Sequence, residues 1–185
     1  HDLPTSFVDR IQSRLGEEST DFFEALGQAT PVSVRLNPAK QSTGWKTFPA
    51  VPWCTKGRYL EERPAFVEDP AFHAGAYYVP AASSMLLDWI VKQLPAPERV
   101  LDLCAAPGGK SSLLAAAIPS ESILVANEVI GKRATILAEN LLKWGQPNTW
   151  VTSADPNQLA QVGALFDWVV VDAPCSGEGL FRKDP

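Results

Sequence analysis

A glycine-containing loop is one of the two features of this sequence best suited to chemistry. The stretch Asp102–Lys110 reads DLCAAPGGK, and its small residues Pro107, Gly108 and Gly109 follow directly after an apolar run. Small residues at such a place let main-chain N–H groups at the start of a helix approach a polar ligand. A proline–glycine turn can also simply connect a strand to a helix. The stretch therefore predicts a ligand-binding loop, with a plain connection as the alternative.

Two phosphate-binding motifs can be tested against this loop. The tripeptide GKS at 109–111 resembles the end of a nucleoside triphosphate loop, but that motif needs glycine at the position of Cys104. The dinucleotide fingerprint fails as well, because Ala106, Gly108 and Ser111 do not supply its three glycines. Neither phosphate motif is present.

Acidic residues that follow successive apolar runs are the second feature. They are Glu128, Asp155 and Asp172, and Glu128 comes 20 residues after Gly108, where α/β folds place a carboxylate against ribose hydroxyls. Aspartate and glutamate also cap helices that follow strands, which is the alternative. Because the acids recur at one edge of the predicted sheet, we favour a ligand rim. An acidic rim suits a cationic cofactor without phosphate, such as S-adenosylmethionine with its sulfonium, ammonium and ribose diol.

The elements that must position these residues follow from the hydrophobic pattern after Arg99. Short apolar runs alternate there with amphipathic helices, which is typical of a parallel α/β sheet with right-handed crossovers. The pattern predicts four strands at 100–103, 123–127, 149–152 and 168–171, and helices at about 110–118, 131–144 and 156–162. The last strand is a β-branched run of the kind found in strands buried on both faces. In the helix 131–144, the predicted packing face comprises Ile136, Leu137, Asn140, Leu141 and Trp144, and Gly145 is the expected cap.

The first part of the chain has a different pattern. Residues 4–28 predict two short helices, the second opening at Thr20 with a capping box to Glu24. Strand spacing follows at 32–36, then loops and short strands up to about residue 79. We therefore expect a small α+β domain at 1–80 and an α/β domain at 81–185. Ser83 or Ser84 is expected to cap a joining helix that packs through Met85, Leu86, Trp89, Ile90 and Leu94.

Composition narrows the class of protein. The formal charge is −5, yet residues 35–63 carry six basic and two acidic residues among aromatic ones, which suits either an RNA-facing segment or a solvated loop. Cys54, Cys104 and Cys175 show no paired spacing of a zinc or disulfide framework, so we expect no metal and a reducing cytoplasm. No apolar run approaches the roughly 18 residues of a membrane helix, so no membrane location is expected.

A second string completes the pattern. Residues 172–179 read DAPCSGEG and present a thiol after an acidic strand end. Together with 102–110, this string resembles the hallmark motifs of the Sun-type family of RNA (cytosine-5) methyltransferases. Further likeness at 31–38 and 83–85 extends the resemblance over the chain, and the N-terminal arrangement is most similar to bacterial ribosomal-RNA members. The resemblance implies an α/β, Rossmann-like S-adenosylmethionine-dependent methyltransferase core, incomplete with the first four strands of a seven-stranded sheet, after a small α+β RNA-facing domain.

The resemblance also implies site residues. Glu128 would bind the ribose, Asp155 the adenine side, and Asp172 and Lys110 the junction of cofactor and target base. Arg133 matches another basic position of the family, and a surface role fits it equally well. The methionine and sulfonium end would be bound by Cys104, Ala105, Ala106, Pro107, Gly108, Gly109 and Lys110.

Catalysis in this family uses two cysteines. The resemblance implies that a downstream Thr-Cys thiol attacks carbon 6 of cytosine, while Cys175 releases the product and Asp172 holds the amide-like edge of the ring. The Thr-Cys dipeptide is expected beyond Pro185, so the 185-residue chain alone is expected to be inactive. DNA cytosine methyltransferases use the Pro-Cys thiol as nucleophile, which leaves attack by Cys175 as an alternative. One departure is Pro80-Ala81, where relatives tend to carry Gln-Glu.

The expected function is therefore methylation of RNA at cytosine carbon 5, with ribosomal RNA as substrate. A tRNA cytosine-5 methyltransferase and a non-catalytic RNA-binding or assembly module remain as alternatives. An amino-methyltransferase is disfavoured, because its fourth strand typically ends in Asp/Asn-Pro-Pro-aromatic rather than Ala173-Pro174-Cys175.

Overall fold

The computed structural model describes residues 3–41 and 44–182, and their contacts group the chain into two compact units. One unit comprises residues 31–173, and the other comprises 1–30 with 174–185. The expected functional division into 1–80 and 81–185 stays a prediction. Among the residues described, none of the helices has the length and apolar character needed to cross a bilayer.

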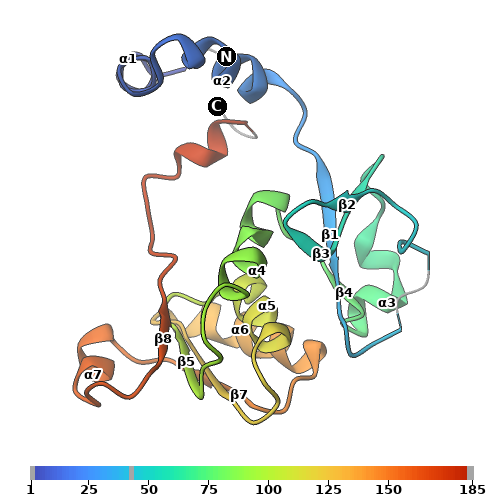
Figure 1. Ribbon diagram of the computed structural model, residues 1–185, viewed down its shortest axis with the longest axis vertical. Helices are drawn as coiled ribbons and strands as arrows, with labels where there is room; N and C mark the ends of the chain where they lie inside the picture. Colours follow the sequence, from blue (N-terminus) through green and yellow to red (C-terminus); the bar gives the residue numbers. More distant parts are fainter. Residues whose placement is uncertain (1–2, 42–43, 183–185) are drawn as a thin grey trace. The chain divides into compact units, whose positions relative to one another are not determined.

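A parallel sheet forms the centre of the larger unit (Figure 1). Its order is β7-β6-β5-β8, and every neighbouring pair is parallel. The α/β fold class and the strand positions are thereby confirmed. The strands are β5 (Arg99–Asp102), β6 (Ile123–Asn127), β7 (Thr149–Thr152) and β8 (Trp168–Val170), with helices α5 (Gly109–Ala117), α6 (Gly131–Trp144) and α7 (Pro156–Ala160) between them.

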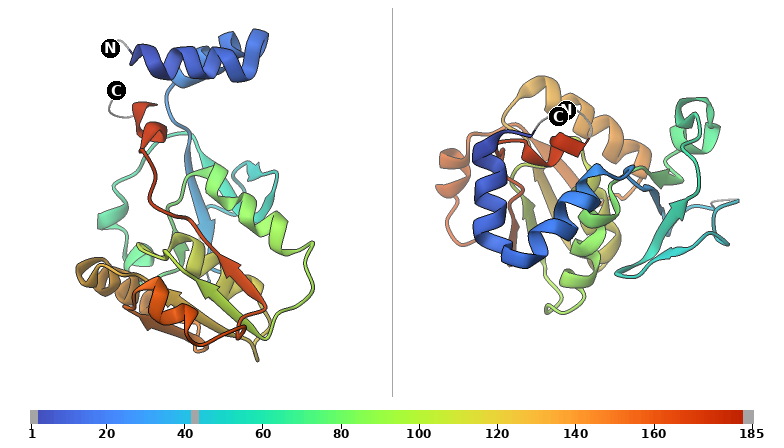
Figure 2. Two further views of the ribbon diagram at one scale, coloured as in Figure 1. Left: turned by 90° about the vertical axis from the view of Figure 1, so that its left-hand side faces the viewer. Right: turned by 90° about the horizontal axis from the view of Figure 1, so that it is seen from above.

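Helices α5 and α6 cover one face of this sheet (Figure 2). Leu114, Leu137 and Trp144 are at most 2% exposed and pack among the strand residues of that face. Gly145 ends α6 with a φ of 84°, as predicted. Ile136 was placed on the packing face but is 49% exposed, so that part of the prediction is wrong.

Strand β8 forms one edge of the parallel sheet in the described part of the chain. Val169 and Val171 are 55% and 54% exposed, so the strand is not buried on both faces as its β-branched run predicts. Trp150, on the same face as Val169, is 62% exposed. The β-branched residues correctly predict a strand here. Whether its faces are buried depends on neighbouring elements, which the local sequence does not determine.

An antiparallel sheet in the order β2-β3-β1-β4 makes up the rest of the larger unit. Its core is an aromatic and aliphatic cluster that includes Val34, Leu60, Phe66 and Tyr77. The elements are β1 (Val32–Leu36), β2 (Ala50–Val51), β3 (Cys54–Leu60), β4 (Tyr77–Tyr78), the 3-10 turn Phe66–Glu68 and the short helix α3 (Pro70–His73).

Polar side chains of β1 and the segment after it bind the two helices of the parallel sheet. Arg35 is buried, donates to Ser112 Oγ of α5 at 2.6 Å and lies over the Trp144 ring at 4.8 Å. Asn37 Nδ2 donates to the carbonyl of Trp144 at 2.8 Å, and Lys40 Nζ donates to that of Lys143. The last carbonyls of α6, which have no partner within the helix, are thereby bonded from the other sheet.

The joining segment is a 3-10 turn, Ala82–Met85, followed by α4 (Leu86–Val91). Met85 and Val91 are buried, but Leu86, Trp89, Ile90 and Leu94 are 42–54% exposed, so the predicted packing stripe is wrong for those four. The predicted serine cap is wrong as well, because Ser84 Oγ donates to the Ala81 carbonyl.

The smaller unit contains α1 (Thr5–Leu15), the 3-10 turn Gly16–Glu18, α2 (Ser19–Gly27) and the turn Glu178–Arg182. Phe7 contacts Phe181 edge to face at 5.0 Å, and Arg10 pairs with Glu178. Helix α2 follows Glu18 without a side-chain cap, so the capping box predicted from Thr20 and Glu24 is wrong.

Candidate active site

The carboxyl ends of the four parallel strands bring most of the predicted site residues to one edge of the sheet. The loop to Lys110 follows β5, Glu128 follows β6, Asp155 follows β7 and Asp172 follows β8. Parallel strands end on the same side, and this is where open α/β sheets bind ligands. All of these residues lie in the 31–173 unit.

The loop after β5 is built for close main-chain approach. Gly108 has a φ of 105° at the start of α5, and a Cβ there would lie 3.2 Å from the Leu137 side chain. Main-chain bonds from Ala105 N to Asn127 O and from Gly108 N to Ala105 O, both 2.8 Å, hold the turn. A glycine is therefore required at position 108 by both conformation and packing.

A pocket of about 230 Å³ lies beside this loop. Tyr78 of β4 lines the pocket, together with residues of the segment that follows this strand. Lys110 and Asp172 lie in the pocket and form an ion pair, so the structure brings these two predicted catalytic residues together. The lining residues are Tyr78, Val79, Pro80, Ser84, Cys104, Ala105, Ala106, Pro107, Gly109, Lys110 and Asp172.

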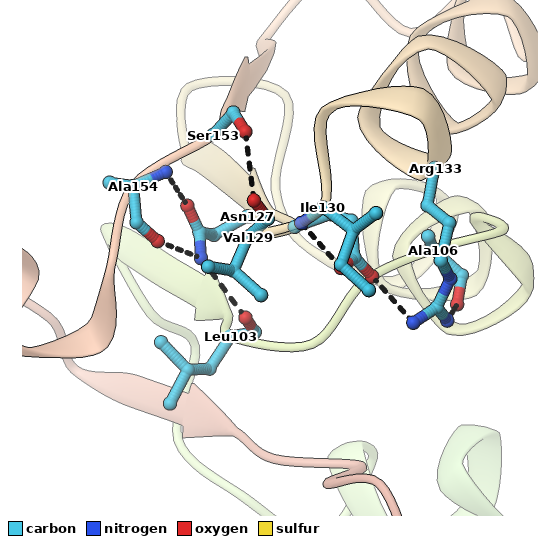
Figure 3. A network of polar contacts seen from close by, with 9 residues as sticks. Leu103, Ala106, Asn127, Val129, Ile130, Arg133, Ser153 and Ala154 are labelled. Carbon is cyan, nitrogen blue, oxygen red and sulfur yellow. Dashed lines mark hydrogen bonds and ion pairs between the residues drawn. The ribbon is translucent and has the colours of Figure 1, made fainter.

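Glu128 is 3% exposed and already has protein partners, among them Ile130 and Arg133, which are labelled in Figure 3. One carboxylate oxygen accepts from Ile130 N at 3.0 Å, and the other lies 3.3 Å from Arg133 Nη1. Arg133 Nη2 also donates to the carbonyl of Ala106 at 3.1 Å. Arg133 therefore links Glu128 to the loop, although its side chain is 45% exposed.

Asp155 is the N-cap of α7. Its side chain accepts from Asn157 N at 2.8 Å, and Gln158 completes a capping box by accepting from Asp155 N. The helix-capping alternative for this residue is thus present in the structure. A contact between Asp155 and a ligand stays a prediction.

The cysteines differ in their surroundings. Cys104 lies in the pocket, where burial, followed by the charges of Glu128, Asp102 and Asp172, raises the pKa of its thiol. Cys54 is buried beside Val51 and Met85, and burial raises its pKa too. Both thiols are thereby kept neutral and unreactive. Cys175 is exposed and belongs to the smaller unit.

Asp102 was not singled out from the sequence as a site residue. It is the last residue of β5, is fully buried, and accepts from Ser111 Oγ at 2.6 Å through Oδ2. Its Oδ1 has no hydrogen-bond partner among the described residues. Burial raises its pKa from 3.8 to about 6. The sequence does contain an indication of this site residue, because Asp102 is an acidic residue at the end of an apolar strand, directly before a glycine-containing loop.

Replacing Asp102 by asparagine is expected to remove a pH-dependent loss of stability. Because the folded-state pKa lies above the unfolded value, folding disfavours the charged carboxylate. The resulting loss of folding free energy is absent below about pH 4 and grows between about pH 4 and pH 6. Above that range it is complete and amounts to at most about 3 kcal/mol. Urea unfolding of Asp102→Asn from pH 4 to 8 should therefore lack the decline in stability that is expected of the wild type.

Asp167 provides the control for that series. Main-chain N–H groups of Arg99 and Glu98 lower the pKa of the Asp167 carboxyl. Asp167→Asn should therefore be less stable than the wild type above the pKa that Asp167 has in the unfolded chain, and should differ little from it at lower pH. If Asp102→Asn and the wild type show parallel pH profiles, the raised pKa of Asp102 is contradicted.

The strand order and the loop after β5 define a Rossmann-like α/β fold, and the comparisons with known proteins define its class as a methyltransferase. A solved structure described as a methyltransferase homolog protein from Pyrococcus horikoshii is similar over 98% of this chain and 62% of that chain, with a TM-score of 0.81 and 29% identity. Residues 90–185 match the family described as 16S rRNA methyltransferase RsmB/F, and residues 3–82 match the N-terminal domain of 16S rRNA methyltransferase RsmF. The chain belongs to the RsmB/F family.

Curated relatives agree with this family. Ribosomal RNA small subunit methyltransferase F of Pectobacterium atrosepticum is 34% identical over 99% of this chain and 41% of its own length. The protein of the same name from Escherichia coli O81 is 36% identical over 99% of this chain and 42% of its own length. The chain thus spans about two fifths of the length of these relatives.

Proposed function

We propose that the complete protein is an S-adenosylmethionine-dependent RNA (cytosine-5) methyltransferase that acts on ribosomal RNA in the cytoplasm. Family membership and the names of the curated relatives support the substrate class. The observation that carries the proposal is the pocket beside the β5 loop, which contains the Lys110–Asp172 ion pair. Free thiols at Cys54, Cys104 and Cys175 are compatible with a reducing compartment. Residues 1–80 are proposed as the RNA-facing domain and 81–185 as the methyltransferase core.

The residues at the strand ends fit a cationic cofactor. Asp102, at the end of β5, has one carboxylate oxygen without a hydrogen bond to any residue that the structure describes, and Glu128 and Asp172 add negative charge at the same edge. A positively charged ligand offsets the cost of keeping such a carboxylate ionised. We propose that 104–110 bind the methionine and sulfonium end, Glu128 the ribose and Asp155 the adenine side. S-adenosylmethionine, when bound, supplies the methyl group.

Residues of this chain are proposed to orient the target base and to assist product release. Lys110 orients the Asp172 carboxylate through the ion pair, and Asp172 accepts a hydrogen bond from the amide-like edge of the target cytosine. Tyr78 lines the pocket, and its ring lies against Gly109 of the loop, where an added Cβ would be 3.1 Å from the ring. Cys175 acts in product release. The attacking thiol is proposed to belong to a Thr-Cys dipeptide beyond Pro185.

The direct test uses the complete protein with radiolabelled S-adenosylmethionine and small ribosomal subunits lacking the modification. Nucleoside mass spectrometry should find 5-methylcytosine in 16S rRNA. Transfer to tRNA alone would favour the tRNA alternative, and a methyl group on an exocyclic nitrogen would contradict the proposed chemistry. Cofactor binding without transfer to either RNA would favour the non-catalytic module.

Glu128→Ala and Asp155→Ala are each expected to weaken binding of S-adenosylhomocysteine. Loss of a charged hydrogen-bond acceptor for the ribose should reduce affinity about 10- to 100-fold for Glu128→Ala. Asp155→Ala should also lower the free energy of unfolding by about 1 kcal/mol, because it removes the cap of α7. Calorimetry on the complete protein measures both affinities.

Asp69→Ala is the matched control for Asp155→Ala. Asp69 is likewise an aspartate N-cap followed by proline, but it caps α3 in the antiparallel sheet region. Its loss should lower stability and leave cofactor affinity unchanged. Unchanged affinity in both Glu128→Ala and Asp155→Ala would show that the strand-end acids do not bind the cofactor.

A further inference from the structure

Asn127 is a buried amide at the centre of the strand-end edge. It is the last residue of β6, which lies between β5 and β7 in the sheet, and it is 1% exposed. Apolar residues fill most positions of β6, so an amide at its end needs a full set of partners. In the sequence, the one indication of this role is an amide side chain at the end of an apolar strand.

Asn127 makes all four hydrogen bonds available to a side-chain amide. Figure 3 shows the bonds to Leu103 and Ala154. Nδ2 donates to the carbonyls of Leu103 at 3.2 Å and Ala154 at 3.0 Å. Oδ1 accepts from Thr152 Oγ1 and from Ala154 N, both at 2.9 Å. The Ala154 N–H and the two carbonyls determine which end of the amide is oxygen and which is nitrogen.

These bonds extend the sheet past the point where strand pairing stops. The last paired residues are Asp102 with Ala126, and Asn127 with Thr152. Leu103 and Ala154 lie just beyond them, next to the main-chain bonds from Ala105 N to Asn127 O and from Glu128 N to Thr152 O. The Asn127 side chain bonds to both chains at that point and so fixes the separation of the two loops.

The atoms held by Asn127 adjoin each segment of the proposed cofactor site. Leu103 directly precedes Cys104, Ala154 directly precedes Asp155, and Glu128 directly follows Asn127. We propose that Asn127 is a positioning residue that holds the β5 loop, Glu128 and the Asp155 loop in one arrangement for the cofactor. This inference rests on the proposed function.

Pre-arranged loops matter most for a ligand that touches both of them. S-adenosylhomocysteine spans the predicted methionine and adenosine ends, whereas adenosine reaches the Glu128 and Asp155 side alone. If Asn127 sets the distance between the loops, its loss weakens the long ligand much more than the short one. A residue that only stabilises the fold affects both ligands alike.

The test compares Asn127→Asp with the wild type in the complete protein. Aspartate keeps the shape but replaces the donor to two carbonyls by an oxygen that repels them. The affinity for S-adenosylhomocysteine is expected to fall about 10- to 100-fold. The ratio of the adenosine Kd to the S-adenosylhomocysteine Kd should fall about tenfold. Asn127→Ser, which replaces the amide by a shorter, uncharged hydroxyl, serves as the second variant should the aspartate disturb folding.

Ser122→Ala is the matched control, because Ser122 is a buried polar residue at the opposite end of β6 that donates to the Pro97 carbonyl at 2.6 Å. It should lower the unfolding temperature and leave the Kd ratio unchanged. Leu124→Val is a second control. Leu124 is a buried residue within β6, so the variant should lower stability without changing the residues at the strand ends.

Hydrogen exchange in the ligand-free protein gives a readout independent of the cofactor. Amides of 103–108 and 153–158 should exchange faster in Asn127→Asp and remain as in the wild type in Ser122→Ala. An unchanged Kd ratio and unchanged exchange in both Asn127 variants would overturn the positioning role while leaving the proposed function intact. Absence of S-adenosylhomocysteine binding by the wild type would overturn the proposed function, and the inference with it.

Discussion

Replacing Cys175 by alanine in the complete enzyme is expected to trap a covalent protein–RNA adduct rather than to abolish it. A thiol that acts in release is needed only after the attacking thiol has bonded to carbon 6 of cytosine, so its removal leaves the adduct in place. Cys175 is exposed, as a thiol that meets an RNA substrate must be. Turnover should cease, and a denaturing gel should show a slowly migrating protein–RNA species.

Cys54→Ala is the control for this experiment, because Cys54 is a buried thiol whose pKa is raised by burial. That variant should turn over and accumulate no adduct. A Cys175→Ala protein that is folded, binds RNA and forms no adduct would make Cys175 the attacking thiol. The release role carried over from the family would then be wrong.

Asp172→Asn is expected to reduce kcat about 100- to 1000-fold, the usual loss when one group that stabilises developing charge is removed from a site. Asparagine keeps the shape of the side chain, so the pocket beside Lys110 stays in place. It loses the ion pair with Lys110 and the negative charge presented to the protonated edge of the base. S-adenosylhomocysteine affinity should change far less than kcat, and single-turnover methylation of 16S rRNA measures the chemical step.

The matched control is Asp88→Asn. Asp88 also pairs with a lysine, Lys92, at 2.6 Å, but on α4 and outside the pocket. An exposed pair of this kind contributes about 1 kcal/mol or less to stability, so activity should remain within about twofold of the wild type. Equal losses in both variants would show that Asp172 has no special part in methyl transfer.

The parallel sheet could be predicted because local pattern determines its elements. The expected strand 123–127 and helix 131–144 coincide with β6 and α6, since an apolar run, a helical period and a glycine cap all agree there. The predicted strand ends place the β5 loop, Glu128, Asp155 and Asp172 on one edge of the sheet, as the structure does. Their contacts with a cofactor remain predictions.

Contacts between distant residues could not be predicted in this way. Helical spacing identified α4 but not its covered side, since burial of Met85 and exposure of Trp89 depend on which elements lie nearby. The pairing of Glu128 with Arg133, and the four bonds of Asn127, require knowing how three chain segments meet. A buried amide in an apolar strand shows only that partners must exist.

Because Asn37 and Lys40 bond the last carbonyls of α6, the α/β core depends on residues outside it to complete the hydrogen bonding of that helix. Family similarity for the core begins at residue 90, but a polypeptide cut there would expose the end of α6 and leave Trp144 without the Arg35 guanidinium. A chimera that joins this core to an unrelated front domain must therefore recreate three side-chain contacts.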